Sequence, residues 1–124
     1  MPSEVKILIK IGTRGSKLAL TQTSHVVDAL KEANPEVEFE IVVIKTTGDI
    51  DQRQNVSELG VGVFVRELEA ALLDNRVDLA VHSLKDMPSS LPPEFTLAAV
   101  PYREDPRDAF ISRNGETLEE IPAR

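Results

Sequence analysis

Two short polar clusters hold the residue types in this 124-residue sequence that are best suited to chemistry. The first cluster is Gly12-Thr13-Arg14-Gly15-Ser16, which places a guanidinium and two hydroxyls among glycines. Backbone amides at a helix start attract anions, and an arginine grips a carboxylate or phosphate through two parallel hydrogen bonds. The cluster therefore indicates either an anion-binding turn or an ordinary capped turn with a solvated arginine. Its spacing fits neither a Walker A loop nor a dinucleotide-binding fingerprint.

The second cluster contains Ser83, Lys85 and Asp86. An aspartate held at the end of a strand can stabilise a developing positive charge or accept a hydrogen bond from a ring N–H. Lys85 is able to pair with a ligand carboxylate. The competing interpretation is a surface Lys–Asp pair, which contributes little free energy.

The two histidines give weaker signals. His25 falls in the middle of an expected helix and His82 inside an expected strand. No second histidine stands at helical spacing, so the pattern does not indicate a metal site, and structural roles are favoured for both. A hydrolase triad of Ser16, His82 and an aspartate is excluded because the sequence has no Gly-x-Ser-x-Gly elbow.

The elements around these clusters follow from hydrophobic periodicity and from breaking residues. The order strand, helix, strand, loop, helix, strand predicts an α/β fold with a parallel or mixed sheet. Both clusters follow strands, so they are expected at the carboxyl edge of the sheet, where such folds bind ligands. The expected strands are 5–11, 37–45, 77–82, 96–100 and 109–112; the expected helices are 17–33 and 63–75, with a loop at 46–59 and a helix start at 117–121.

Composition narrows the class of protein. The net charge of −7 argues against a binder of nucleic acid or of an anionic membrane, which needs a basic face. There is no cysteine, so disulfides and thiolate metal sites are impossible within these residues. The first residues contain no apolar signal-peptide core, and no apolar run has the length of a membrane span. We therefore expect a cytoplasmic protein that binds neither nucleic acid nor membrane.

Five motifs in this sequence, taken in order, resemble the family of hydroxymethylbilane synthases, also called porphobilinogen deaminases. The resemblance runs from about residue 7 to the end, and five co-ordered motifs are far more specific than one. The matching stretches are Ile11 to Gln22, Thr46-Thr47-Gly48-Asp49, Phe64 to Glu69, Asp78 to Pro88 and Arg103 to Phe110.

The resemblance implies a transferase that joins four porphobilinogen molecules into hydroxymethylbilane, with release of ammonia, in tetrapyrrole biosynthesis. It implies a dipyrromethane cofactor, attached through a thioether to a cysteine. It also implies a fold in which the first two of three domains are similar to periplasmic binding proteins of type II, with a mixed sheet flanked by helices. Residues 1–102 then supply most of the first domain, and 103–124 a hinge and the start of the second. From sequence alone, the charged run at 103–108 reads equally well as a solvated corner.

The resemblance also assigns roles to residues by position. Asp86 matches the catalytic aspartate, which stabilises the cation left when ammonia departs and the pyrrole N–H groups. The residues that match those holding the acetate and propionate groups are Arg14, Ser16 and Lys85. Ser83 and Asp49 match residues that line the cleft, and Gln22 and Phe64 match positions near it. For Phe64, this adds a possible ring contact to a role in the core.

The sequence departs from the family at two points. Val61 stands where many relatives have a lysine in a glycine-rich loop, and the cofactor-bearing cysteine is absent. We therefore expect these 124 residues alone to be inactive. The resemblance also implies that the first domain is unfinished here, so we expect exposed apolar surface that promotes self-association, although the intact family enzyme is usually monomeric. Three interpretations remain open: a fragment of the transferase, a free-standing module that binds a small polycarboxylate, and half of a split enzyme.

Overall fold

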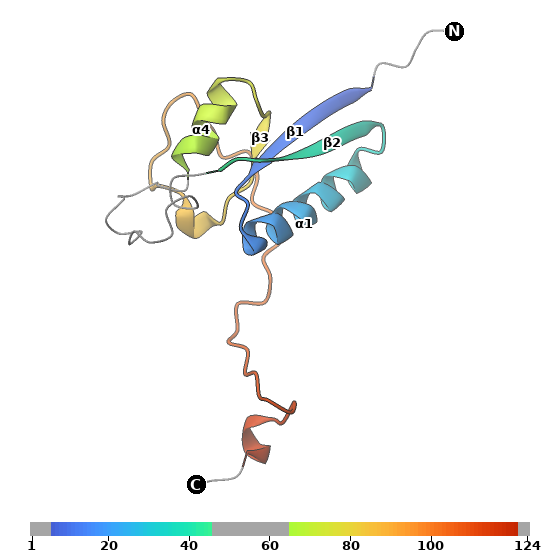
Figure 1. The fold of residues 1–124 in the computed structure, drawn as a ribbon, viewed down its shortest axis with the longest axis vertical. Coiled ribbons are helices and arrows are strands. Elements are labelled where there is room, and N and C mark those ends of the chain that lie inside the picture. Colours follow the sequence, from blue (N-terminus) through green and yellow to red (C-terminus); the bar gives the residue numbers. More distant parts are fainter. Residues whose placement is uncertain (1–5, 46–64, 122–124) are drawn as a thin grey trace.

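The computed structural model describes residues 6–45 and 65–121. Its elements alternate between strands and helices, and Figure 1 shows their arrangement. In chain order they are β1 (Ile7–Thr13), α1 (Lys17–Ala33), β2 (Val37–Val43), α4 (Arg66–Leu73), β3 (Leu79–Ala80) and two 3-10 helices, η1 (Leu84–Asp86) and η2 (Leu118–Glu120).

The three strands form a parallel sheet in the order β2-β1-β3. Strand β1 pairs with β2 along its whole length, from Ile7 opposite Val37 to Thr13 opposite Val43. Strand β3 pairs with β1 only near the carboxyl end of β1, where Ile11 lies opposite Leu79. Two further backbone hydrogen bonds extend this pairing, from the amide of Asp78 to Lys10 and from that of Val81 to Gly12. The chain segment before the second polar cluster is thereby held against the end of β1.

The two helices cover opposite faces of the sheet (Figure 1). Because successive side chains of a strand point to opposite faces, neighbouring residues of β1 contact different helices. On one face, the Thr13 hydroxyl reaches the carbonyl of Ala19 in α1 at 3.4 Å. On the other face, a side chain added at Gly12 would lie 3.1 Å from both Leu68 of α4 and Val77. Glycine is therefore the residue that lets α4 approach β1 closely.

The core on the α4 face is small and lies beneath the carboxyl end of the sheet. Its buried members are Ile44, Leu68, Ala71 and Val77. Helix α4 ends at Leu73 with Asp74 as its C-cap, and the next residue, Asn75, has a φ of 58°, the left-handed conformation in which helices commonly terminate. The turn at Asn75 brings the chain back to begin β3.

Several sequence predictions are corrected by the structure. Residues 96–100 and 109–112 are not strands, and the three described strands are all parallel, so the sheet in this part of the chain is not mixed. The third strand is shorter than 77–82, because β1 offers it only two paired positions. The expected helix at 117–121 is the single 3-10 turn η2. The loop predicted at 46–59 lies outside the described residues.

Residues 97–121 extend away from the sheet and helices, as Figure 1 shows. Large apolar side chains in this segment are exposed, including Val100, Tyr102, Phe110 and Ile111. β-forming residues need a partner strand to form a ladder, and these have none among the described elements, which explains why both predicted strands are missing here. Among the described residues, no helix combines the length and apolar character needed to cross a membrane.

Candidate functional site

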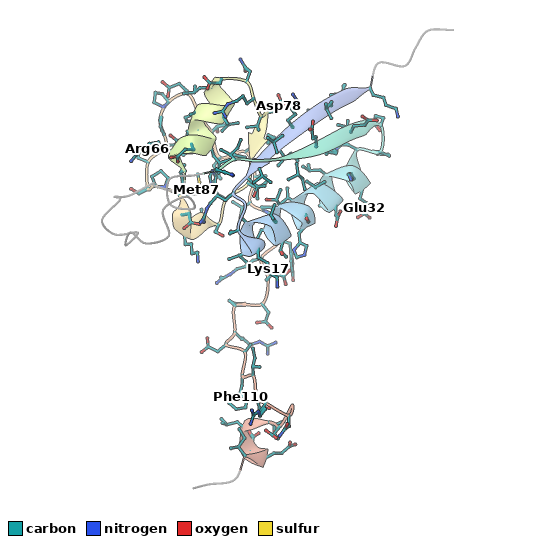
Figure 2. The ribbon with its side chains drawn as sticks, in the orientation of Figure 1. Lys17, Glu32, Arg66, Asp78, Met87 and Phe110 are labelled. Atoms are coloured by element: carbon teal, nitrogen blue, oxygen red, sulfur yellow. The ribbon has the colours of Figure 1, made fainter. Side chains whose placement is uncertain are left out.

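The two polar clusters predicted from the sequence meet at one small cavity of about 130 Å³. It lies where β1 runs into α1 and where β3 runs into η1. Figure 2 labels Lys17 at the start of α1 and Met87 directly after η1, one residue beyond each of the two junctions. Six of the predicted site residues line the cavity: Arg14, Ser16, Gln22, Ser83, Lys85 and Asp86.

An ion pair joins the two clusters across the cavity. The Arg14 guanidinium lies 3.8 Å from the Asp86 carboxylate, and each side chain is 19% exposed. At this separation the pair is a loose electrostatic contact and not a close bidentate one.

A hydrogen bond forms a second link between the clusters. The Ser83 hydroxyl donates to the side-chain carbonyl oxygen of Gln22, with 2.8 Å between the two oxygen atoms. Gln22 belongs to α1, and Ser83 precedes η1. The bond therefore fixes the second cluster against the helix that follows the first.

Ser16 combines a structural role with a place in the cavity. It is the N-cap of α1, and its hydroxyl oxygen accepts a hydrogen bond from the backbone amide of Ala19 at 3.2 Å. This bond uses a lone pair of the hydroxyl, so the hydroxyl proton remains able to donate to a ligand. The cap also orients the start of α1, whose positive dipole end faces this edge of the sheet.

The charged groups that line the cavity are unequal in number. Arg14 and Lys85 supply positive charge, and Asp86 supplies negative charge. The site is thus locally basic in a chain whose net charge is −7. It has cations and a hydroxyl that suit carboxylates, and a carboxylate that suits a ring N–H or a developing positive charge.

His82 also lines the cavity, although the sequence favoured a structural role for it. Burial lowers the pKa of His82 from its ordinary value of 6.5, Asp86 acts in the opposite direction, and Arg14 lowers it further. Its position directly before Ser83 was the signal available in the sequence. A structural role for His82 stays the prediction from its sequence pattern, and the structure adds that the residue lies at the cavity.

Three hypotheses from the sequence are not tested by the structure. Asp49, Phe64 and the departure at Val61 lie outside the described residues. His25 is exposed on α1 and is not among the residues lining the cavity. Within the described ranges 6–45 and 65–121, no group of three or more metal-ligating side chains could hold a metal ion.

The fold and the site together define an α/β protein with a small, locally basic cavity at the carboxyl edge of a parallel sheet. A family model described as "Porphobilinogen deaminase, dipyromethane cofactor binding domain" matches residues 9–124. The chain belongs to the porphobilinogen deaminase family.

Curated relatives agree with the family match. The chain is 55% identical over 116 residues to the porphobilinogen deaminase of Shouchella clausii, a match that covers 93% of this chain and 37% of that relative. It is 52% identical over 114 residues to the enzyme of Brevibacillus brevis, covering 91% of this chain and 37% of the relative. With the enzyme of Burkholderia mallei, identity is 48% over 99% of this chain and 38% of the relative. The chain thus spans somewhat more than a third of the length of these relatives.

Proposed function

We propose that this chain forms the part of a porphobilinogen deaminase that holds pyrrole carboxylates for condensation. In the whole protein, four porphobilinogen molecules are joined into hydroxymethylbilane, and ammonia is released at each addition. The observation that carries the proposal is the convergence of Arg14, Ser16, Lys85 and Asp86 on one cavity.

The chemistry of the substrate is complementary to this cavity. Porphobilinogen carries two carboxylates, one pyrrole N–H and an aminomethyl group that leaves as ammonia. Arg14, Lys85 and the Ser16 hydroxyl suit the carboxylates, because charge-assisted hydrogen bonds to carboxylates are among the strongest in proteins. Asp86 suits the N–H and the ring that becomes positively charged when ammonia leaves.

Asp86 is the proposed catalytic residue. Its carboxylate lies at the end of η1, and its backbone amide donates to the carbonyl of Ser83 at 3.0 Å. This short turn fixes the backbone of Asp86 before the reaction, so less reorganisation is needed as charge develops. Ser83 and Gln22 are proposed to hold the turn in place through their hydrogen bond. Asp49 and Phe64 are proposed as further lining residues from the resemblance.

The cavity fits part of a dipyrromethane cofactor. Dipyrromethane carries carboxylate side chains and two pyrrole N–H groups, which match the cations and the carboxylate of the cavity. The chain has no cysteine to form the thioether, so any covalent attachment requires residues beyond these 124. When bound, the cofactor supplies the primer on which the chain of pyrroles grows; Arg14, Ser16 and Lys85 would hold its carboxylates, and Asp86 its N–H groups.

We propose two further features of the whole protein. Residues 1–102 belong to a domain similar to periplasmic binding proteins of type II, and 103–124 form the hinge and the start of a second domain. The extended, exposed course of residues 97–121 supports this boundary, because a segment between domains makes few contacts with either. A cytoplasmic location is proposed from the absence of cysteine in these residues.

The test is turnover of porphobilinogen by the gene product that contains this chain, with the product measured as uroporphyrin after oxidation. Asp86→Asn keeps the size of the side chain and removes its charge. We expect kcat to fall by about 100-fold or more, which is typical for loss of a group that stabilises the transition state electrostatically. Asp28→Asn, at an exposed position of α1, is the matched control and should retain activity. Wild-type turnover no faster than the uncatalysed blank would contradict the proposal.

The absence of cysteine favours one alternative, a binding module without chemistry. The two functions are told apart by whether porphobilinogen releases ammonia. A module would bind a pyrrole carrying acetate and propionate groups, lose that binding in the variant, and release no ammonia from porphobilinogen. The transferase would release ammonia and form uroporphyrin precursors. The 124-residue chain on its own is expected to stay at the level of the blank.

A further inference from the structure

His82 occupies an unusual position for a histidine with no assigned role. It lies between β3 and Ser83, is partly buried, and lines the same cavity as the proposed binding groups. The chain contains only one other histidine, His25, which is exposed on α1. Burial of an imidazole favours its neutral form.

The charged groups around His82 come from the turn between β1 and α1 and from η1. Arg14, in the turn before α1, disfavours the protonated imidazole, and Asp86 in η1 favours it. Lys85 of η1 lines the same cavity and adds positive charge nearby, and the residues that α1 itself contributes to the lining are uncharged. Among the described residues, burial and Arg14 together outweigh Asp86, so the pKa of His82 lies below its ordinary value of 6.5.

We propose that His82 is a further ligand-binding residue, which takes up a proton when an anionic ligand enters the cavity and then adds positive charge to that of Arg14 and Lys85. The ligand class is a small molecule with two or more carboxylates, and for this identity the inference rests on the proposed function.

Ligand binding and protonation of His82 are thermodynamically linked. Carboxylates placed beside His82 favour its charged form and offset the effect of Arg14, so they raise the pKa of the imidazole. A group whose pKa rises on binding must take up protons in the interval between its free and bound values. Affinity therefore increases as pH falls through that interval. Each unit of rise in pKa permits a gain of up to about tenfold in affinity.

The experiment is calorimetry on the gene product that contains this chain. The probe is a pyrrole with acetate and propionate side chains but no aminomethyl group, which binds without reacting. Measurements in buffers of different ionisation enthalpy, between about pH 5.5 and pH 7.5, give the number of protons taken up. Wild type is expected to take up a fraction of a proton per ligand, and His82→Gln to bind with less uptake and a flatter dependence of affinity on pH. His25→Gln, the matched control, should behave as wild type.

The outcomes separate this inference from the proposed function. Binding whose proton uptake is the same in wild type and His82→Gln overturns the role of His82 and leaves the proposed function intact. If the probe does not bind at any pH, both are overturned. A structural role for His82 would weaken binding in the variant at every pH equally, without changing proton uptake.

A second measurement needs no ligand. Nuclear magnetic resonance follows the ring protons of His82, which are assigned by their loss in His82→Gln. Arg14→Gln should raise the pKa of His82 and Asp86→Asn should lower it, because each variant removes one of the charges that act on the imidazole. A pKa that responds to neither variant would show that His82 is not coupled to the binding groups, and it would overturn the inference independently.

Discussion

The two ends of the sheet differ in how well they are packed. At the carboxyl end of β1, Ile11, Gly12 and Thr13 are buried, whereas at the amino end Ile7 and Leu8 are 57% and 45% exposed. The difference arises because α4 and β3 reach only the carboxyl half of β1. Packing is therefore concentrated directly beneath the candidate site.

The cavities at the two ends of the sheet differ in volume and in the side chains that line them. The cavity at the carboxyl end has about 130 Å³ and groups that converge from two polar clusters. A groove of about 750 Å³ runs along β2 toward the amino end, lined by Leu8, Phe39, Lys31, Glu38 and Glu40 among others. In its lining, Glu38 forms an ion pair with Lys6 at 3.2 Å, and Lys31 and Glu40 are exposed. The larger hollow is thus the less specific one, and size alone does not identify a site.

The largest expected effect tests the packing at the carboxyl end. Leu68 of α4 is fully buried, and Leu68→Ala should lower the free energy of unfolding by about 3 kcal/mol, from lost apolar burial and the cavity left behind. Urea unfolding followed by circular dichroism gives this value. Leu8→Ala, at the exposed amino end, is the matched control and should cost about 0.5 kcal/mol or less. Equal costs at both positions would mean that the two ends are packed alike.

A smaller effect is expected at the close approach of β1 and α4. In Gly12→Ala, the new methyl group would lie 3.1 Å from Leu68 and 3.1 Å from Val77, so both neighbours must move. Overpacking of this kind costs about 1–2 kcal/mol. The double variant Gly12→Ala with Val77→Ala should cost less than the sum of the two single changes, because the smaller side chain makes room. Additive costs in the same unfolding experiment would exclude the contact as their source.

Local patterns predicted the parts of the fold that depend on nearby residues. The helix expected at 17–33 is α1 with the same bounds, because Ser16 caps its start and Asn34 ends it. The second strand begins at Val37 as expected and ends at Val43. Arg14, Ser16, Ser83, Lys85 and Asp86 meet at one cavity because both clusters follow strands, and parallel strands bring their carboxyl ends to one edge. Gln22 lies in α1 and was named only from the family resemblance.

The features that were missed depend on residues far apart in the chain. The strand expected at 96–100 has suitable residues but no partner among the described strands, and a β-strand requires one. The length of β3 is set by its register against β1, which its own sequence does not contain. For His82 the sequence favours a structural role, because a single histidine in a strand gives no sign of the arginine and aspartate that the fold places around it.

The core beneath the site also contains a polar group whose replacement should stabilise the protein. Thr23 of α1 is fully buried, and within the described part of the chain its hydroxyl oxygen has no hydrogen-bond partner. Thr23→Val replaces the hydroxyl by a methyl group of similar size and should raise the free energy of unfolding by about 1 kcal/mol. Thr21→Val on the same helix is the control, since Thr21 is exposed and donates to the carbonyl of Lys17. A loss of stability in Thr23→Val would mean that the hydroxyl is satisfied.

The smallest expected effect is the dependence of stability on pH that His82 introduces. In the unfolded chain its pKa returns toward 6.5, whereas in the folded chain burial holds it lower. As pH falls below 6.5, the unfolded chain takes up a proton that the folded chain does not, so the free energy of unfolding decreases until the folded-state pKa is reached. In His82→Gln this part of the slope should disappear, while His25→Gln should keep it, in urea titrations at a series of pH values.

The carboxyl end of the sheet would then contain both the tightest packing and an acid-sensitive group, because the same burial that excludes water from the core also disfavours the charged imidazole. An unchanged slope in His82→Gln would place the acid sensitivity elsewhere in the chain.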